Sequence, residues 1–248
     1  MNIASLNARV QYGRGVAASK LGQTYDVYSL TAASNGQVVS GTPRLTGFPA
    51  SLTHWGDAKD IENHILGTLS FGATCDNRYL RLGDILVGYG YGSENAMYAV
   101  AQLRPFKQTV LVRTEQPATI TRPTTNNVSL NPTGPTMVTS FSGLEKMNEL
   151  VLTLVNGTYS FQSSGTSAMV PVGIQPTDSL REYPPSKIPT DTRRQVFIGY
   201  IPLLPGVILE ENDVISSGSA GDRYRIAMNY IAEYGLEGQI VVLEKLLV

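Results

Sequence analysis

The chain has 248 residues and a formal net charge of −1, from 19 Lys and Arg residues against 20 Asp and Glu residues. Basic residues do not cluster beyond Arg193-Arg194. The charge composition therefore does not predict a basic face that binds nucleic acid or an anionic membrane. Charged residues make up only 16% of the sequence, and a surface rich in hydroxyl and amide groups suits extensive packing against other proteins.

The N-terminal segment is expected to form a short helix. The apolar side chains of residues 8–21 are compatible with one helix face, and Gly22 is a good stop. The alternating residues 25–30 predict a strand. The next apolar groups, 38–39 and 45–48, lie among Gly, Pro and Ser residues, which predicts a loop without regular secondary structure.

Residues 56–69 carry the clearest helical pattern of the first half. Ile61, Ile65 and Leu69 are spaced four residues apart and would share one face. The apolar run 79–82 that follows predicts a strand.

A pattern of three strands with turn-rich spacers occurs twice. Each copy opens with an Asp and apolar residues, continues with a strand that begins at a Tyr, and closes with an apolar strand. The copies comprise residues 84–86, 98–103 and 109–112, and residues 213–215, 224–229 and 239–242. They predict a small antiparallel β unit built twice. Asp84 lies fourteen positions before Tyr98, whereas Asp213 lies eleven before Tyr224, so duplication and convergence both stay open.

Prolines mark two breaks in the remaining sequence. Residues 117–135 contain four prolines among Thr and Asn residues, which predicts a linker. Residues 177–194 contain three more and predict a long loop, which is uncommon in a compact domain unless it has a role. Residues 144–154 fit either a helix or a strand, and 157–162 and 195–201 predict strands.

The short strands, frequent turns and few helices predict a mainly β protein with minor α content. We expect two small β-barrel or sandwich domains in tandem, with an N-terminal helix and one short internal helix. The expected organisation is an N-terminal helical arm (1–22), a first β domain (23–122), a Pro/Thr/Asn-rich linker (123–140) and a second β domain (141–248).

The sequence predicts no catalytic, metal or cofactor site. His54 and His64 do not have a zinc-ligand spacing, and Cys75 has no base partner that the sequence identifies. No nucleophile elbow, P-loop or paired-cysteine ligand set is found. We therefore expect a protein that is not an enzyme; an enzyme would need a pocket that joins one of the histidines to a carboxylate.

Cysteine usage and hydropathy indicate where the chain folds. Cys75 is the only cysteine, which excludes an intrachain disulfide. Neither a signal-peptide core nor an apolar stretch of membrane-spanning length is found. We expect a protein that folds in a cytoplasm and does not enter a membrane.

Residues 88–92 alternate Gly with Tyr89 and Tyr91. No helix is expected to follow them, so a hairpin tip is a better prediction than a phosphate-binding loop. Exposed loop tyrosines favour a protein interface. The alternative is an adhesive β module that binds carbohydrate through Tyr89, Tyr91 and Trp55.

Two parts of the sequence resemble structural proteins of tailed bacteriophages. Residues 12–22, which run directly into 25–28, resemble the start of virion proteins in which a small-residue helix leads into an apolar strand. The segments 83–86 with 98–101, and 213–215 with 221–227, resemble the small β barrels of head–tail joining and neck proteins. Together they cover about a quarter of the chain.

The resemblance implies a virion structural protein, made in the bacterial host cytoplasm, that forms a homo-oligomeric ring in the neck. The alternative within the same resemblance is a structural or adhesive module of the tail or baseplate. Its expected partners are the portal or adaptor on one side and the tail tube or terminator on the other, with DNA passing through the ring lumen. The N-terminal segment 8–21 and the loop 177–194 are the expected docking elements. The interface candidates are Tyr12, Arg14, Lys20, Tyr89, Tyr91, Arg181, Tyr183, Arg193 and Arg194.

Overall fold

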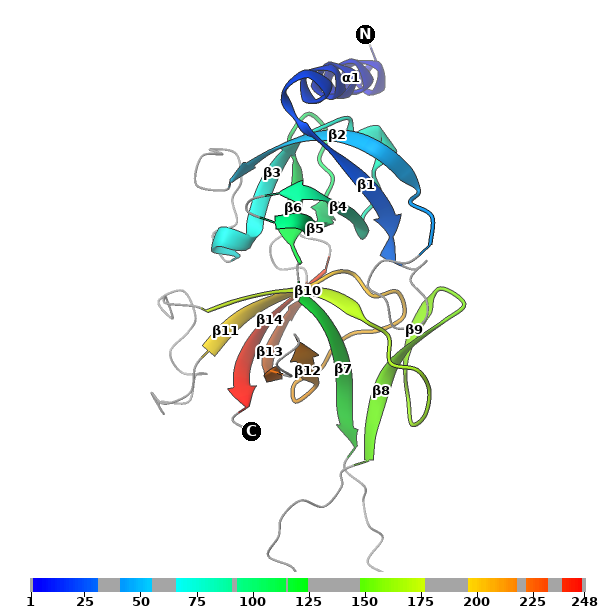
Figure 1. The fold of residues 1–248 in the computed structure, drawn as a ribbon, viewed down its shortest axis with the longest axis vertical. Coiled ribbons are helices and arrows are strands. Elements are labelled where there is room, and N and C mark those ends of the chain that lie inside the picture. The colour runs from blue at the N-terminus through cyan, green and yellow to red at the C-terminus, as the bar shows by residue number, and fades with distance from the viewer. Residues whose placement is uncertain are drawn as a thin grey trace, which may run out of the picture.

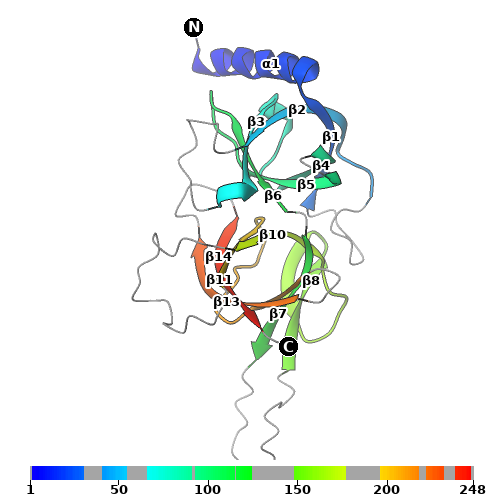
Figure 2. The same ribbon diagram turned by 60° about the vertical axis from the view of Figure 1, so that its left-hand side comes forward.

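The computed structural model describes residues 2–30, 41–54, 66–90, 93–114, 116–124, 148–176, 196–217, 222–231 and 238–246. These residues form one α-helix and two β units stacked end to end, and the helix lies across the far end of the first unit (Figures 1 and 2). The prediction of a mainly β protein with two small β domains and an N-terminal helix is confirmed.

The helix α1 (Ile3–Leu21) is followed by a closed barrel of six antiparallel strands in the order β1-β2-β3-β6-β5-β4. The strands are β1 (Gln23–Ser29), β2 (Leu45–His54), β3 (Ser70–Thr74), β4 (Asp84–Gly90), β5 (Ser93–Gln102) and β6 (Thr109–Arg113). Two short 3-10 helices, η3 (Gly67–Leu69) and η4 (Asn77–Tyr79), flank β3.

The second unit is an eight-stranded sheet in the order β10-β11-β14-β13-β12-β7-β8-β9. Its strands are β7 (Gln116–Thr124), β8 (Asn148–Val155), β9 (Thr158–Gln162), β10 (Val170–Pro176), β11 (Val196–Ile201), β12 (Val214–Ser217), β13 (Asp222–Ile231) and β14 (Gln239–Leu246). An additional pairing of β10 with β7 closes six of these strands into a ring, and the β8–β9 hairpin extends from β7.

The two rings are the same unit with the same register. When β1 is matched to β7, the ring order of the first barrel becomes that of the second, with the β8–β9 hairpin inserted after β7. Leu86 lies opposite Tyr98 in the first ring, and Ile215 lies opposite Tyr224 in the second. The repeated three-strand pattern is therefore two copies of one antiparallel meander.

The irregularities of the two meanders also coincide. The pairing of β5 with β6 shifts register between Val100 and Gln102, and that of β13 with β14 shifts between Ile226 and Met228. Both shifts lie at the third residue after the repeated Tyr, and each is a β-bulge that bends the strand. A bulge at a corresponding place in both rings suits sheets that must curve enough to close.

Asp84 and Asp213 occupy the same place in the two rings, in the turn that starts the meander. The residues before them, Gly83 and Asn212, have positive φ angles of 80° and 75°. Their N–H groups donate to backbone carbonyls of the middle strand of each meander, in β5 and β13. Gly and Asn adopt this backbone conformation at the lowest cost. The turn thus depends on a Gly-Asp or Asn-Asp pair.

The carboxylates of Asp84 and Asp213 hold these turns from inside. Both residues are buried, and each accepts a hydrogen bond from the backbone N–H three residues earlier, at 2.7 Å and 2.8 Å. Arg44 pairs with Asp84, and Arg122 pairs with Asp213 at 2.8 Å. The repeated Asp therefore has a structural role in both rings.

An aromatic cluster fills the first barrel. The rings of Phe71 and Tyr98 meet edge to face with centroids 5.4 Å apart, and Tyr25 contacts Tyr98 in the same manner at 6.1 Å. Burial raises the pKa of Tyr25 to about 12. This core is separate from the cluster that spans the junction of the two units.

A second core joins the two units. Ile85, Ala99 and Val112 of the first barrel belong to the same buried cluster as the side chains of the second ring. Gly173 of β10 lies so close to the carbonyl of Arg113 that a Cβ atom would have no room. The two units therefore pack directly on each other through β6 and β10.

Several local predictions are wrong or lie outside the described residues. Residues 45–48, expected to be irregular, begin β2, and residues 79–82, expected to be a strand, form the end of η4 and a turn. The expected internal helix 56–69 lies mostly outside the described residues, and its last three residues form η3. The sequence of the segment 144–154 fits either a helix or a strand, and from residue 148 onward it forms strand β8.

Residues 116–122 lie in β7, which pairs with β8, β10 and β12 of the second unit, although they were assigned above to the first domain. The prolines of this segment suggested a linker that would begin by residue 117. Pro117 and Pro171 are each the second residue of their strands and lie opposite each other. A missing N–H is tolerated at the start of a strand. Most of the linker predicted at 123–140 lies outside the described residues.

Candidate interaction surface at the N-terminal helix

The helix α1 has well-defined ends. The Asn2 side chain accepts a hydrogen bond from the Ala4 N–H at 3.1 Å and caps the N-terminus. At the other end the Gly22 N–H donates to the Ala18 carbonyl at 2.7 Å. The predicted helix is confirmed, and it begins five residues earlier than its apolar pattern indicated.

Most of α1 is exposed. Gln11 and Ala18 are its only buried residues. The large apolar side chains Ile3, Leu6 and Leu21 are 73%, 43% and 82% exposed. A helix of a soluble domain normally turns its apolar side chains toward the core, and α1 instead leaves these three side chains largely in water.

Polar contacts and small residues hold α1 on the barrel. The Arg14 guanidinium donates to the carbonyls of Phe106, at 2.7 Å, and Lys107, and the Asn7 side chain accepts from the Phe106 N–H at 3.2 Å. Gly15 lies against Asp76, where an added Cβ would be 2.9 Å from the Asp76 Cβ. The helix is therefore seated by close backbone approach and a few hydrogen bonds, with little apolar burial.

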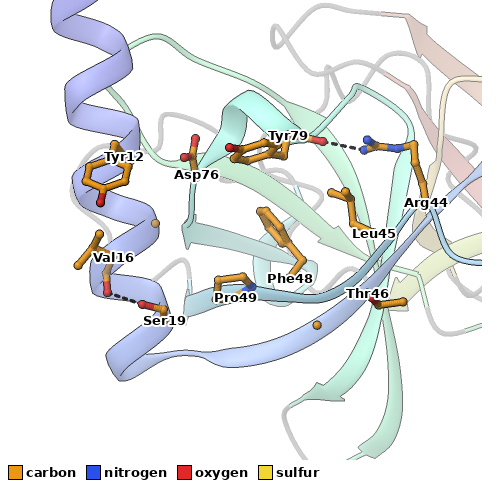
Figure 3. A pocket seen from close by; sticks show the side chains of 12 residues that line it. Tyr12, Val16, Ser19, Arg44, Leu45, Thr46, Phe48, Pro49, Asp76 and Tyr79 are labelled. Atoms are coloured by element: carbon orange, nitrogen blue, oxygen red, sulfur yellow. Dashed lines mark hydrogen bonds between the residues drawn. The ribbon is translucent and has the colours of Figure 1, made fainter.

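A cleft of about 590 Å³ opens between α1 and the barrel (Figure 3). Tyr12, Val16 and Ser19 line it from α1. The N-terminal half of β2 lines it with Leu45, Phe48 and Pro49, and η4 contributes Tyr79. Tyr12 and Tyr79 are 63% and 55% exposed, whereas Phe48 is buried in the floor.

The charged groups at the cleft are already paired within the protein. Arg44 forms an ion pair with Asp84 and also donates to the Tyr79 carbonyl at 2.8 Å. Arg78 donates to the Asp76 carboxylate at 2.8 Å, and this hydrogen bond holds the pKa of Asp76 below its usual range. Burial raises the pKa of Asp84, and its partners oppose that effect. The cleft therefore offers aromatic and apolar surface with its charges compensated.

The structure brings only part of the predicted interface together. Tyr12 lines the cleft, Arg14 is bound to the barrel, and Lys20 lies exposed in the last turn of α1. Tyr89 is 59% exposed on β4 and does not line the cleft. Tyr91, Arg181, Tyr183, Arg193 and Arg194 lie outside the described residues.

Sequence reasoning missed Tyr79 and the N-terminal half of β2 as parts of this surface. Tyr79 was assigned to a strand because it precedes an apolar run. Asp76 could have indicated a short helix at this place, because Asp is a favoured N-terminal capping residue. In the structure the Asp76 side chain caps η4 and accepts a hydrogen bond from the Arg78 N–H at 3.3 Å.

The residues considered for chemistry have structural surroundings in the described part of the chain. His54 packs edge to face on Phe71, with ring centroids 5.3 Å apart. Cys75 is buried and its pKa is raised to about 11, first by burial, so it is a thiol at neutral pH. His64 lies outside the described residues. The described residues contain no group of three or more His, Cys, Asp or Glu side chains placed to hold a metal ion.

A helix able to cross a membrane would have to be long and apolar, and none in the described ranges has both properties. No protein-family model, curated protein or solved structure matches this chain.

Proposed function

We propose that this chain is a non-enzymatic structural protein of a tailed bacteriophage virion, assembled in the cytoplasm of the bacterial host. It forms a ring of identical subunits at the neck, where it connects the portal of the capsid to the tail. The phage assignment is supported by two resemblances to virion proteins. One is that of the N-terminal segment, and the other is that of the two three-strand meanders in which the repeated Asp and Tyr occur.

The observation that carries the proposal is the exposed helix α1. Ile3, Leu6 and Leu21 are too exposed to stabilise the isolated subunit by burial. Covering them in an interface would bury apolar surface that the subunit alone leaves in water. Subunits of a permanent assembly carry apolar surfaces of this kind.

The closed rings also favour assembly through side chains. Closing a sheet removes the open strand edges through which β proteins otherwise associate. In the described residues the outermost strand is β9, at the end of the inserted hairpin. Contacts between copies would therefore come from α1, from connecting segments or from the outer edge of β9.

A near-neutral chain is also compatible with DNA passing through the lumen of the ring. Strong positive charge would hold the DNA backbone, because cationic side chains that neutralise phosphates bind with high affinity. With a formal net charge of −1, the subunit need not present such a lining.

The proposal is tested by making α1 polar. A triple variant, Ile3→Ser, Leu6→Ser and Leu21→Ser, is expected to fold as the parent does and to be lost from purified virions. The matched control is Ile208→Ser, which removes a 60% exposed apolar side chain from the second unit and should be incorporated normally. Circular dichroism checks folding, and quantitative mass spectrometry of virions measures incorporation. Normal incorporation of a folded triple variant would overturn the role of α1.

A further inference from the structure

The exposed face of α1 carries positive charge that has no acidic partner within the described part of the chain. Arg9 and Lys20 are eleven residues apart, which is about three helical turns, so they share the face opposite the buried Gln11 and Ala18. Neither cation forms an ion pair with a described residue. α1 itself contains no acidic residue, although acid–base pairs along a helix surface would stabilise it. This face is therefore cationic.

The end of the barrel beneath α1 adds further positive charge. The Arg14 guanidinium donates to the carbonyls of Phe106 and Lys107, which carry no net charge to compensate it. Lys107 is exposed in the turn between β5 and β6 and forms no ion pair with a described residue. The segments that meet here, 2–22, 76–82 and 103–108, contain seven Lys and Arg residues and a single acidic residue, Asp76. Arg78 already pairs with Asp76.

The second unit shows the opposite arrangement of charge. Each Lys or Arg that the structure describes there forms an ion pair with a carboxylate, and these cations are Arg122, Arg223, Arg225 and Lys245. Uncompensated positive charge in the described residues is therefore concentrated at the end of the molecule where α1 lies (Figure 1). The formal net charge of −1 conceals this asymmetry.

Apolar side chains lie among the cations of α1. Leu6, Tyr12 and Val16 are exposed on the same face as Arg9 and Lys20. A DNA backbone would pair with the cations and leave these apolar side chains in water, whereas a protein surface with acidic and apolar residues would cover both. Arg and Tyr are also enriched in protein interfaces. In a ring through which DNA must pass, cations facing the DNA would hold it, so a protein is the better partner for this face.

A second copy of this chain is a poor match in its described residues. Five carboxylates of the second unit are already in ion pairs, those of Glu149, Glu210, Asp213, Asp222 and Glu244. Glu211 is the one described carboxylate of that unit outside an ion pair. Charge complementarity therefore favours a different protein.

We propose that the face formed by α1 and the turn at Lys107 binds an acidic, partly apolar surface of a different virion protein. The inference rests on the proposed ring and names the chemistry of the component next to it. The cations orient the encounter and select an acidic partner. The apolar side chains between them then lose their contact with water.

Carbodiimide cross-linking of purified virions tests the contact, because this reagent joins a lysine amine directly to a carboxylate as an amide. After digestion, mass spectrometry is expected to find Lys20 or Lys107 linked to an Asp or Glu of another virion protein. Lys245 lies 2.9 Å from the Asp222 carboxylate, so the link between these two residues is the internal control for the reaction.

Neutral variants test the charge. Arg9→Gln with Lys20→Gln should raise the protein concentration needed for half-maximal binding to incomplete particles, made by a phage that lacks this chain, about tenfold. The matched control is Ser163→Glu with Thr166→Glu, at exposed positions of the second unit. It changes the net charge by the same amount and should bind as the parent does. Equal binding of the parent and the Gln variant would overturn the proposal.

The remaining outcomes separate this contact from the proposed function. Virions that contain the chain but link Lys20 and Lys107 only to the chain itself, or to nothing, would overturn the contact and leave the ring proposal standing. Binding of the parent to a short DNA duplex that the Gln variant loses, without cross-links to another protein, would overturn it in favour of nucleic acid. A chain that is absent from virions would overturn both.

Discussion

Gly13 and Gly15 are two residues apart in α1, which places them on nearly opposite faces of the helix, and their surroundings differ. A Cβ atom on Gly13 would meet nothing within 4 Å, whereas one on Gly15 would be 2.9 Å from the Asp76 Cβ. Gly15 therefore lets the helix approach the barrel, and Gly13 has no such role in the isolated subunit.

Alanine substitutions at these two positions should have opposite effects on stability. Gly13→Ala is expected to stabilise the protein by about 0.5 to 1 kcal/mol, because Ala loses less backbone entropy in a helix. Gly15→Ala gains the same propensity but forces α1 away from Asp76, so its Tm should fall below that of the parent. Thermal unfolding of both variants measures this. A Gly15→Ala protein as stable as Gly13→Ala would show that α1 is not seated as described.

Asp76 gives a prediction about pH. The hydrogen bond from Arg78 lowers its pKa in the folded protein, so the folded state favours the ionised carboxylate. Its contribution to stability is complete above the unfolded pKa of about 3.9 and is lost as the pH falls through the lower folded value. Asp76→Asn should therefore have a lower Tm than the parent at pH 7, and the difference should close toward pH 3. A difference that stays constant over this range would contradict the ionic role.

At the scale of elements, the two Asp-Arg pairs hold the same turn in both rings. Asp213→Ala removes a buried carboxylate and leaves Arg122 and the backbone N–H of Glu210 without that acceptor. Breaking a buried pair of this kind costs about 3 kcal/mol. The exposed pair of Glu149 with Arg223, at 3.3 Å, is the control, and Glu149→Ala should cost less than about 1 kcal/mol. Urea unfolding measures both, and equal effects would contradict the structural role of Asp213.

The strands with regular side-chain alternation could be predicted from the sequence. The repeated Asp and Tyr revealed the meander in both halves, because the Asp marks its turn and the Tyr faces the first strand. Strand β2 was missed because Gly47, with a φ of +62°, and Pro49 make its sequence look like a loop. In β7 the prolines concealed a strand whose partners lie up to about a hundred residues away.

The cleft could not be predicted because its walls come together only when the first ring closes. Tyr12 and Tyr79 are far apart in sequence, and Phe48 belongs to a strand that the sequence did not reveal. Tyr12 was named as an interface residue from the resemblance of its segment alone. Residues that are distant in sequence form this cleft, and no periodic pattern within one segment of the sequence marks them.

At the scale of the whole molecule, the shared core makes the two rings one packed body. Gly173 brings β10 against β6, and the buried side chains of both units form one cluster there. The cleft and the strands of the second unit therefore lie on one scaffold, with α1 at one end (Figure 2).

The central claim is that copies of this chain associate into a ring at the phage neck. Electron microscopy of the purified protein, together with antibody labelling of its parent virions, tests it most directly. We expect closed rings of one subunit number and label at the junction of head and tail. A protein that remains monomeric at every concentration and is absent from purified virions would contradict the account.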